Sequence, residues 1–115
     1  MKKLFCLAIL AFSLAEPALA VGVAQHATIV KMHVRRSIGE VVFLQLSVAP
    51  TGSPSCATAA WTWHFSFPTS TEAGKKLLAM LLAAQAQGAP VTIDGTGTCS
   101  DYAGVESLDG VVLER

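Results

Sequence analysis

The sequence lacks an excess of charge of either sign and is poor in cysteine. Lysine and arginine together number eight, as do aspartate and glutamate, so the formal net charge is zero. A balanced chain has no electrostatic footprint for nucleic acid or for an anionic membrane surface. No C-x-x-C or H-x-x-x-H spacing supplies a clustered set of zinc ligands. The sequence therefore predicts no nucleic-acid partner and no metal site.

The N-terminal residues have the pattern of an export signal. Two lysines precede an apolar run over residues 4–15, and Ala18-Leu19-Ala20 has the small-x-small pattern that signal peptidase requires. The run is shorter than the about 20 apolar residues of a membrane-spanning helix. We predict a signal peptide over residues 1–20, cleaved after Ala20. A retained anchor is the alternative; a lipoprotein is disfavoured because Cys6 lies inside the apolar run.

The predicted mature chain, residues 21–115, forms a single domain in the periplasm or outside the cell. The first 20 residues hold two of the eight basic and one of the eight acidic residues, which leaves a net charge of −1. Cys56 and Cys99 remain after cleavage, and two cysteines in an exported domain usually pair. We predict a structural disulfide; a reactive thiol pair is the alternative. No membrane association is expected once the signal is removed.

The first half of the mature chain predicts a β-hairpin. Residues 28–35 alternate apolar and polar side chains, with Val30, Met32 and Val34 on the apolar face. A turn with Gly39 at positive φ links them to a second strand over residues 40–48. The basic pair at this turn, Arg35 and Arg36, is predicted to be solvated.

Residues 59–67 show the clearest alternation in the chain, with four aromatic residues between Thr, His and Ser side chains. The pattern predicts a strand whose aromatic face lies in the core. If Trp61 and Trp63 instead faced outward, they would form a stacking platform for sugar rings.

A helix is predicted to follow Pro68. Thr69 and Glu72 have the spacing of a capping box, Gln87 is the expected last residue, and Gly88 is the expected C-cap. At 100° per residue, one arc of the helix is apolar. This arc consists of Leu77, Leu78, Met80, Leu81, Leu82 and Ala84.

Two further strands, over residues 90–94 and 110–114, give the order β-β-β-α-β-β; residues 102–109 are ambiguous between turn and strand. This order is the plan of a five-stranded OB-fold Greek-key barrel, in which the helix closes one end. The predicted class is mainly β with one helix. An α+β sheet with one covering helix is the alternative.

Residues 71–108 carry a family resemblance. The stretch from Thr71 reads TEAGKKLLAMLLAAQAQGAPVTIDGTGTC, and VESL follows. It resembles a group of small exported bacterial proteins of unassigned function, which share GK-x-LLA-x-LLAA, G-x-P-V and G-x-G-x-C. It is also distantly similar to the receptor-binding B subunits of ring-forming bacterial toxins of the subtilase cytotoxin type. The resemblance implies a disulfide-bearing OB fold with a Cys56–Cys99 bridge, and no glycan-contacting residue carries over.

No constellation in the sequence indicates catalysis or a cofactor. Gly95-Thr96-Gly97 lacks the other glycines and the lysine of phosphate-binding loops, and is predicted to be a tight turn beside the bridge. Asp94 and Asp101 could form a carboxylate pair, but loop carboxylates are usually solvated. Ser66 and His64 are neighbours on one strand face and not a triad.

The three histidines, His26, His33 and His64, are not spaced as metal ligands. His33 and His64 alternate with apolar residues and are predicted to lie on outer strand faces.

The predicted function is that of a non-enzymatic exported binding domain, with a glycan or another protein as ligand. The alternative is a structural or assembly subunit of an exported complex or toxin-like ring. For this alternative, the strip formed by Ala79, Ala83 and Ala86 would let a helix of another copy approach closely, as in a homo-oligomer.

Overall fold

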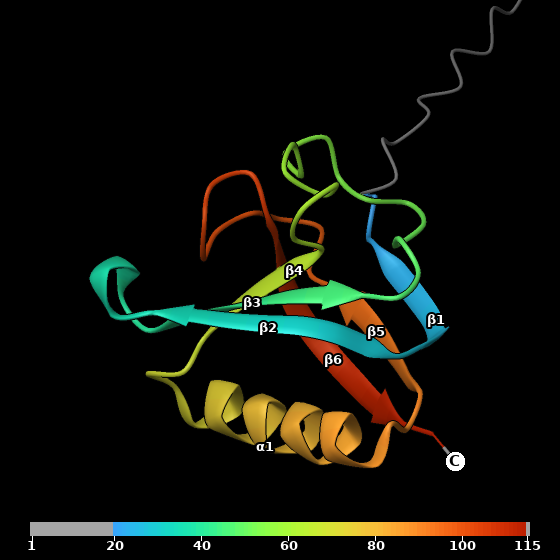
Figure 1. Ribbon diagram of the computed structural model, residues 1–115. Helices are drawn as coiled ribbons and strands as arrows, with labels where there is room; N and C mark the ends of the chain where they lie inside the picture. The colour runs from blue at the N-terminus through green and yellow to red at the C-terminus, as the bar shows by residue number, and fades with distance from the viewer. Residues whose placement is uncertain (1–19, 115) are drawn as a thin grey trace, which may run out of the picture.

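The structure is a computed structural model and describes residues 20–114. The predicted signal peptide, apart from Ala20, lies outside the described residues. Six strands and one α-helix make up the fold (Figure 1). Their bounds are β1 Val23–Ala27, β2 Ile29–Arg35, β3 Val41–Leu46, β4 Phe65–Pro68, α1 Glu72–Gln87, β5 Val91–Gly95 and β6 Glu106–Leu113. Within residues 20–114, no helix is long and apolar enough to cross a membrane.

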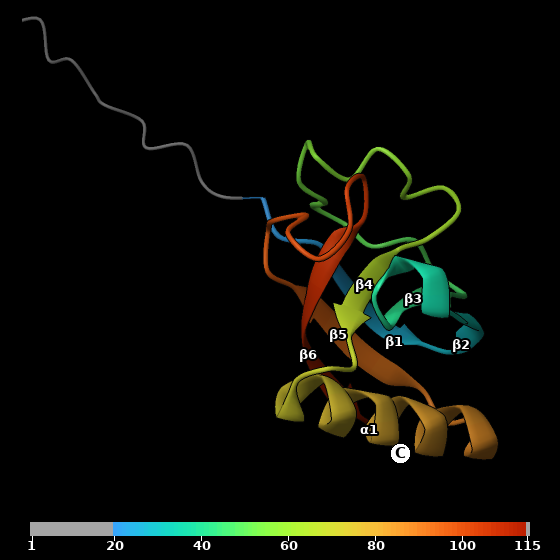
Figure 2. The same cartoon turned by 90° about the vertical axis from the view of Figure 1, so that its left-hand side faces the viewer.

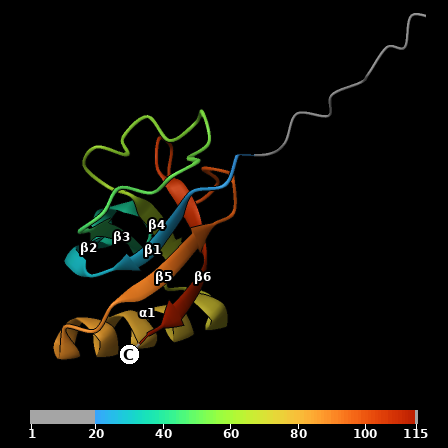
Figure 3. The ribbon, with the colours of Figure 1, turned by 90° about the vertical axis from the view of Figure 1, so that its right-hand side faces the viewer.

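The six strands form one curled sheet in the order β1-β5-β6-β4-β3-β2. All neighbours are antiparallel except β4 and β6, which are parallel. Although β1 and β2 stand at opposite ends of this order, only Thr28 separates them in the chain. The sheet therefore curls into a half-barrel whose two ends lie on one bent segment (Figure 3). His26, with φ of 50°, and a register shift between Ala24 and Ala27 mark the bend.

The predicted class, mainly β with one helix and one disulfide, is confirmed. The strand count differs by one, because β1 was not predicted: the predicted first strand, residues 28–35, corresponds to β2, and β1 precedes it across the bend. The last strand begins at Glu106 and not at Gly110 as predicted. Of the ambiguous residues 102–109, the first four therefore lie in a loop and the last four in β6.

The main core lies between the curled sheet and α1, which runs across one end of the half-barrel (Figure 2). Phe65, Phe67, Leu44 and Ile93 are buried there together with Leu81 from the helix. Burying a leucine or phenylalanine side chain of this kind contributes about 1.5–3 kcal/mol. The sheet supplies most of this core and the helix covers it.

The apolar arc of α1 is wider than its buried face. Leu81 and Ala84 are fully buried, as predicted, whereas Met80 is partly exposed and Leu82 is 49% exposed. The prediction that the whole arc packs on the barrel is therefore wrong at these two positions. At 100° per residue, Met80 and Leu82 lie at opposite edges of the arc, on either side of Leu81, so the buried face is narrower than the arc.

The helix caps differ from prediction at one end. Thr71, not Thr69, is the N-cap, and its hydroxyl accepts a hydrogen bond from the Gly74 N–H at 3.0 Å. Thr69 follows β4 and is held to the residue before β3, because its N–H and its hydroxyl both donate to the carbonyl of Glu40. The C-cap is Gly88 in the left-handed conformation, as predicted.

The β2–β3 hairpin is present, with a 3₁₀ turn over Arg36–Ile38 and Gly39 at φ 78°. The predicted apolar face of β2 is only partly buried. Val30 is exposed, and Val34 is 62% exposed. Strand β2 pairs with β3 alone, so its free edge leaves these side chains open to solvent.

The predicted strand over residues 59–67 is wrong in its first half. Only Phe65–Pro68 pairs as β4; residues 47–64 form a long loop. The N–H of Ala59 donates to the carbonyl of Gly104, and the next residues turn back onto Ala59. As a result Trp61 is 83% exposed and not in the core, whereas Phe65 is fully buried as predicted.

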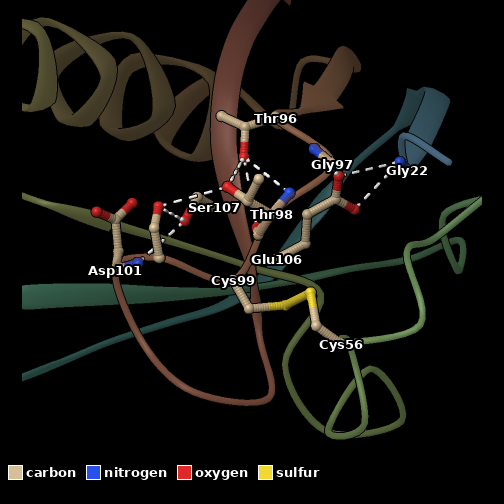
Figure 4. The surroundings of a disulfide bond; sticks show 10 residues. Gly22, Cys56, Thr96, Gly97, Thr98, Cys99, Asp101, Glu106 and Ser107 are labelled. Atoms are coloured by element: carbon tan, nitrogen blue, oxygen red, sulfur yellow. Dashed lines mark hydrogen bonds between the residues drawn. A yellow bond between two sulfur atoms is a disulfide. The ribbon is translucent and has the colours of Figure 1, made fainter. Parts of the chain in front are cut away.

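The disulfide between Cys56 and Cys99 is present, as predicted, and closes a sequence separation of 43 residues (Figure 4). It joins the 47–64 loop to the segment that follows β5. These two loops gather at the end of the half-barrel away from α1 (Figure 1). The bridge thus fixes long loops that contribute little to the main core.

Candidate functional site

A cleft lined by aromatic residues lies on the face of β2 and β3 opposite the main core. We call it the aromatic cleft; its volume is about 250 Å³. Its lining consists of His33, Arg35, Ile38, Phe43, Trp63 and Tyr102.

Five elements supply the lining of the aromatic cleft: β2, β3, the 3₁₀ turn and two loops. His33 on β2 lies directly opposite Phe43 on β3, and Arg35 is the next residue on the same face of β2. Ile38 comes from the 3₁₀ turn. Trp63 and Tyr102 come from the two loops that the disulfide joins. The Ala59–Gly104 backbone hydrogen bond of 2.8 Å also holds these loops together.

The aromatic side chains pack on one another around Phe43. Its ring centroid lies 4.8 Å from that of Tyr102 in a T-shaped arrangement and 5.7 Å from that of Trp63. Trp63 lies 5.6 Å from His33. Phe43 is buried and forms the floor, whereas Tyr102 is partly exposed at the side. Aromatic contacts of this kind contribute about 0.5–1.5 kcal/mol each beyond their buried area, so they stabilise this arrangement of the rings.

Arg35 supplies the polar side of the cleft. Its Nε donates to Nε2 of His33 at 2.9 Å, which orients the guanidinium. In the described part of the chain, no carboxylate lies within 4.0 Å of this guanidinium. Its remaining N–H groups are therefore available to hydroxyl or carboxylate oxygens of a ligand. The sequence-based prediction that Arg35 is merely solvated did not anticipate this neighbour.

Most of the aromatic cleft was not evident from the sequence. The sequence predicts Trp63 on the core face of a strand and His33 on an outer strand face. It places Phe43 within the second strand of the hairpin and Tyr102 in a segment that is ambiguous between turn and strand. The hairpin pairing of β2 and β3 is a signal that could have placed His33 beside Phe43. No local sequence pattern indicates that the two loops bring Trp63 and Tyr102 to the same cleft.

His64 is buried, so its predicted position on an outer face is wrong. The N–H of Leu46 donates to Nδ1 of His64 at 2.9 Å. Burial lowers the pKa of His64 from its ordinary value. The neutral imidazole is thus a structural acceptor at the start of β4. The neighbouring Ser66 is also buried, and its hydroxyl has no hydrogen-bond partner among the described residues.

The other candidate residues lie apart from the cleft. His26 is exposed, with Nδ1 2.8 Å from the Glu114 carboxylate. Asp94 lies on β5 opposite Gly110. Asp101 lies two residues after Cys99, and its N–H donates to the Ser107 hydroxyl. No group of three or more His, Cys, Asp or Glu residues within 20–114 is arranged to hold a metal ion.

A second cavity, the apolar groove, opens between β2 and α1 with a volume of about 310 Å³. Its apolar lining consists of Met32, Val34, Val42, Leu78 and Leu82. It bears on the assembly alternative, as does the alanine strip, whose three residues are exposed on α1.

No family model, curated protein or solved structure matches the chain.

Proposed function

We propose that the mature chain is a non-enzymatic binding domain, exported to the periplasm or beyond, that holds a glycan in the aromatic cleft. The observation that carries the proposal is the combination of aromatic faces with the oriented Arg35 in one preformed cleft. Flat aromatic faces match the apolar C–H faces of sugar rings, and the guanidinium donates to sugar oxygens. The site needs no nucleophile or cofactor to do this.

The fold that we propose is an OB-type barrel. If β1 and β2 are counted as one bent strand, the chain has five strands, with α1 between the third and the fourth. The bent strand pairs with both β3 and β5, and the parallel pair β4–β6 brings the third and fifth strands together. OB-type domains bind ligands on the face of strands two and three and in the flanking loops. In this count the aromatic cleft lies on strands one and two and in the flanking loops, so it shares only strand two, β3, and the loops with that site. The OB-type assignment therefore rests on the strand topology.

Export is proposed from the signal-like N-terminus and the disulfide, which persists in oxidising compartments. A distant relation to the toxin B subunits is part of the same proposal and concerns the fold alone.

A glycan array with matched tryptophan variants tests the proposal. Trp61 and Trp63 lie on one loop, but only Trp63 lines the cleft. We expect wild type and Trp61→Ala to bind the same glycans, and Trp63→Ala to lose at least about tenfold in affinity. Because Trp63 also packs on Phe43, Arg35→Ala serves as a second variant that leaves the aromatic cluster intact. No glycan bound by wild type, or equal loss in both tryptophan variants, would contradict the proposal.

The second candidate is an assembly subunit, and the apolar groove favours it. Val34 and Leu82 are 62% and 49% exposed at its sides, which is apolar surface that a second protein would cover. Light scattering of the mature protein measures the mass directly. An oligomer that Leu82→Lys converts to monomer supports this candidate, with Ala83→Glu testing the alanine strip. A monomeric wild type refutes self-assembly.

A further inference from the structure

Glu106 is a buried carboxylate with no cationic partner among the described residues. It is 1% exposed at the start of β6. Both of its oxygens accept from the N–H of Gly22 at 3.1 Å, and Oε2 also accepts from the N–H of Gly97 at 2.9 Å (Figure 4). No Lys, Arg or His nitrogen in residues 20–114 lies within 4.0 Å of it. Neutral donors offset only part of the cost of burying a carboxylate.

The backbone around Glu106 leaves space for this carboxylate and for little else. A Cβ on Gly22 or on Gly95 would overlap with the Glu106 side chain. Gly97 has φ of 81°, a conformation that favours glycine and aims its N–H at the carboxylate. Three glycines from two distant segments thus form a cradle around one acidic group.

The predicted cleavage site lies beside this cradle. By covalent geometry the nitrogen of Val21 is at most about 4 Å from that of Gly22, and hence within about 7 Å of the Glu106 carboxylate. Ala20 and Val21 also pack against Gly97, whose N–H donates to Glu106. A Cβ on Gly97 would meet the Ala20 carbonyl at 3.1 Å and the Val21 side chain at 3.3 Å. The start of the mature chain is therefore fixed next to the carboxylate.

We propose that Glu106 is the docking site for the α-ammonium group that signal cleavage creates on Val21. Cleavage adds one water across the Ala20–Val21 peptide bond. Ala20 leaves with a carboxylate, and Val21 keeps an α-amine that binds a proton below its ordinary pKa of about 8. In the precursor the same nitrogen is a neutral amide. Cleavage thus supplies the missing positive charge, and the mature chain is more stable than the precursor. The inference rests on the predicted cleavage site and is independent of the glycan proposal.

A double-mutant cycle separates this ion pair from a merely structural role of Glu106. The mature chain beginning at Val21 is prepared with a free α-amine and with an acetylated one, each as wild type and as Glu106→Gln. We expect acetylation to lower the Tm of the wild type by about 5 °C or more. It should leave the Tm of Glu106→Gln nearly unchanged. Equal shifts in both backgrounds, or no shift in either, would overturn the proposal.

A second measurement needs no substitution, in case Glu106→Gln does not fold. The rate of acylation of the α-amine at neutral pH is compared between the folded chain and an unfolded peptide with the same first residues. We expect at least about tenfold slower acylation in the folded chain, because the paired ammonium is a poor nucleophile. A chain extended to begin at Ala20, whose amine lies one residue further out, should react faster than the Val21 chain. Equal rates for all three would exclude the pairing.

Discussion

Reduction of the Cys56–Cys99 disulfide should lower stability by an amount that can be worked out from the loop it closes. The bridge spans a sequence separation of 43 residues. On the chain-entropy model, a closed loop of this length removes about 13 cal/mol/K from the unfolded ensemble, or about 4 kcal/mol at 25 °C. Each kcal/mol shifts the Tm of a domain of this size by about 4–8 °C, so we expect a fall of about 16–32 °C.

The same experiment reports on the aromatic cleft, because the bridge joins the loops that carry Trp63 and Tyr102. Oxidised and reduced protein are compared by circular dichroism melting, with a Cys56→Ala/Cys99→Ala double variant as the permanently reduced control. Tryptophan emission is recorded in parallel and should shift to longer wavelength on reduction. A Tm that changes by less than about 3 °C with unchanged emission would refute the argument that the bridge holds these loops.

Two further changes test individual contacts. Burial holds the pKa of His64 below its ordinary value of 6.5, so the unfolded chain takes up the proton first as pH falls. The contribution of His64 to the free energy of unfolding should be fully present above about pH 6.5. It should be lost progressively as the pH falls from there through the lower pKa of the folded state. His64→Asn, which keeps an acceptor for the Leu46 N–H, should flatten this decline in Tm, and an unchanged slope would contradict it. Thr71→Ala should cost about 1 kcal/mol in urea unfolding, through loss of the N-cap. A larger cost for Thr69→Ala would contradict that cap assignment.

Features set by local chemistry could be predicted from the sequence. The helix ends at Gln87 because Gly88 takes the left-handed conformation, and Gly39 turns the hairpin for the same reason. The cysteine pair needed only the count left after the predicted cleavage. The glycines act on neighbouring residues in the sequence, and each of the two cysteines has only the other as a disulfide partner.

The aromatic alternation over residues 59–67 failed because the pattern is local and the competing contacts are not. Backbone pairing between Ala59 and Gly104 and the tether at Cys56 draw this segment into a loop. Trp61 then has no sheet beneath it, whereas Phe65 lies on paired strands. A pattern of period two cannot show whether a partner strand is present.

The aromatic cleft and the buried carboxylate were beyond sequence reasoning for a related reason. The cleft combines residues of five elements, and Glu106 accepts hydrogen bonds from donors 84 and 9 residues away in the chain. A glutamate is expected at the surface unless partners are known. The sequence predicts only a tight turn at Gly95 and Gly97. In the structure Gly95 also makes room for the Glu106 side chain, and the N–H of Gly97 donates to it.

The most direct test of the glycan proposal is an NMR titration of the isotopically labelled mature protein with a glycan selected on the array. The two tryptophans give two indole N–H signals that report separately on the cleft and on the exposed loop. The proposal predicts that the Trp63 indole and the Arg35 Nε–H signals shift together and saturate, while the Trp61 indole stays in place. Shifts confined to Trp61, or to residues of the apolar groove such as Leu82, would contradict it.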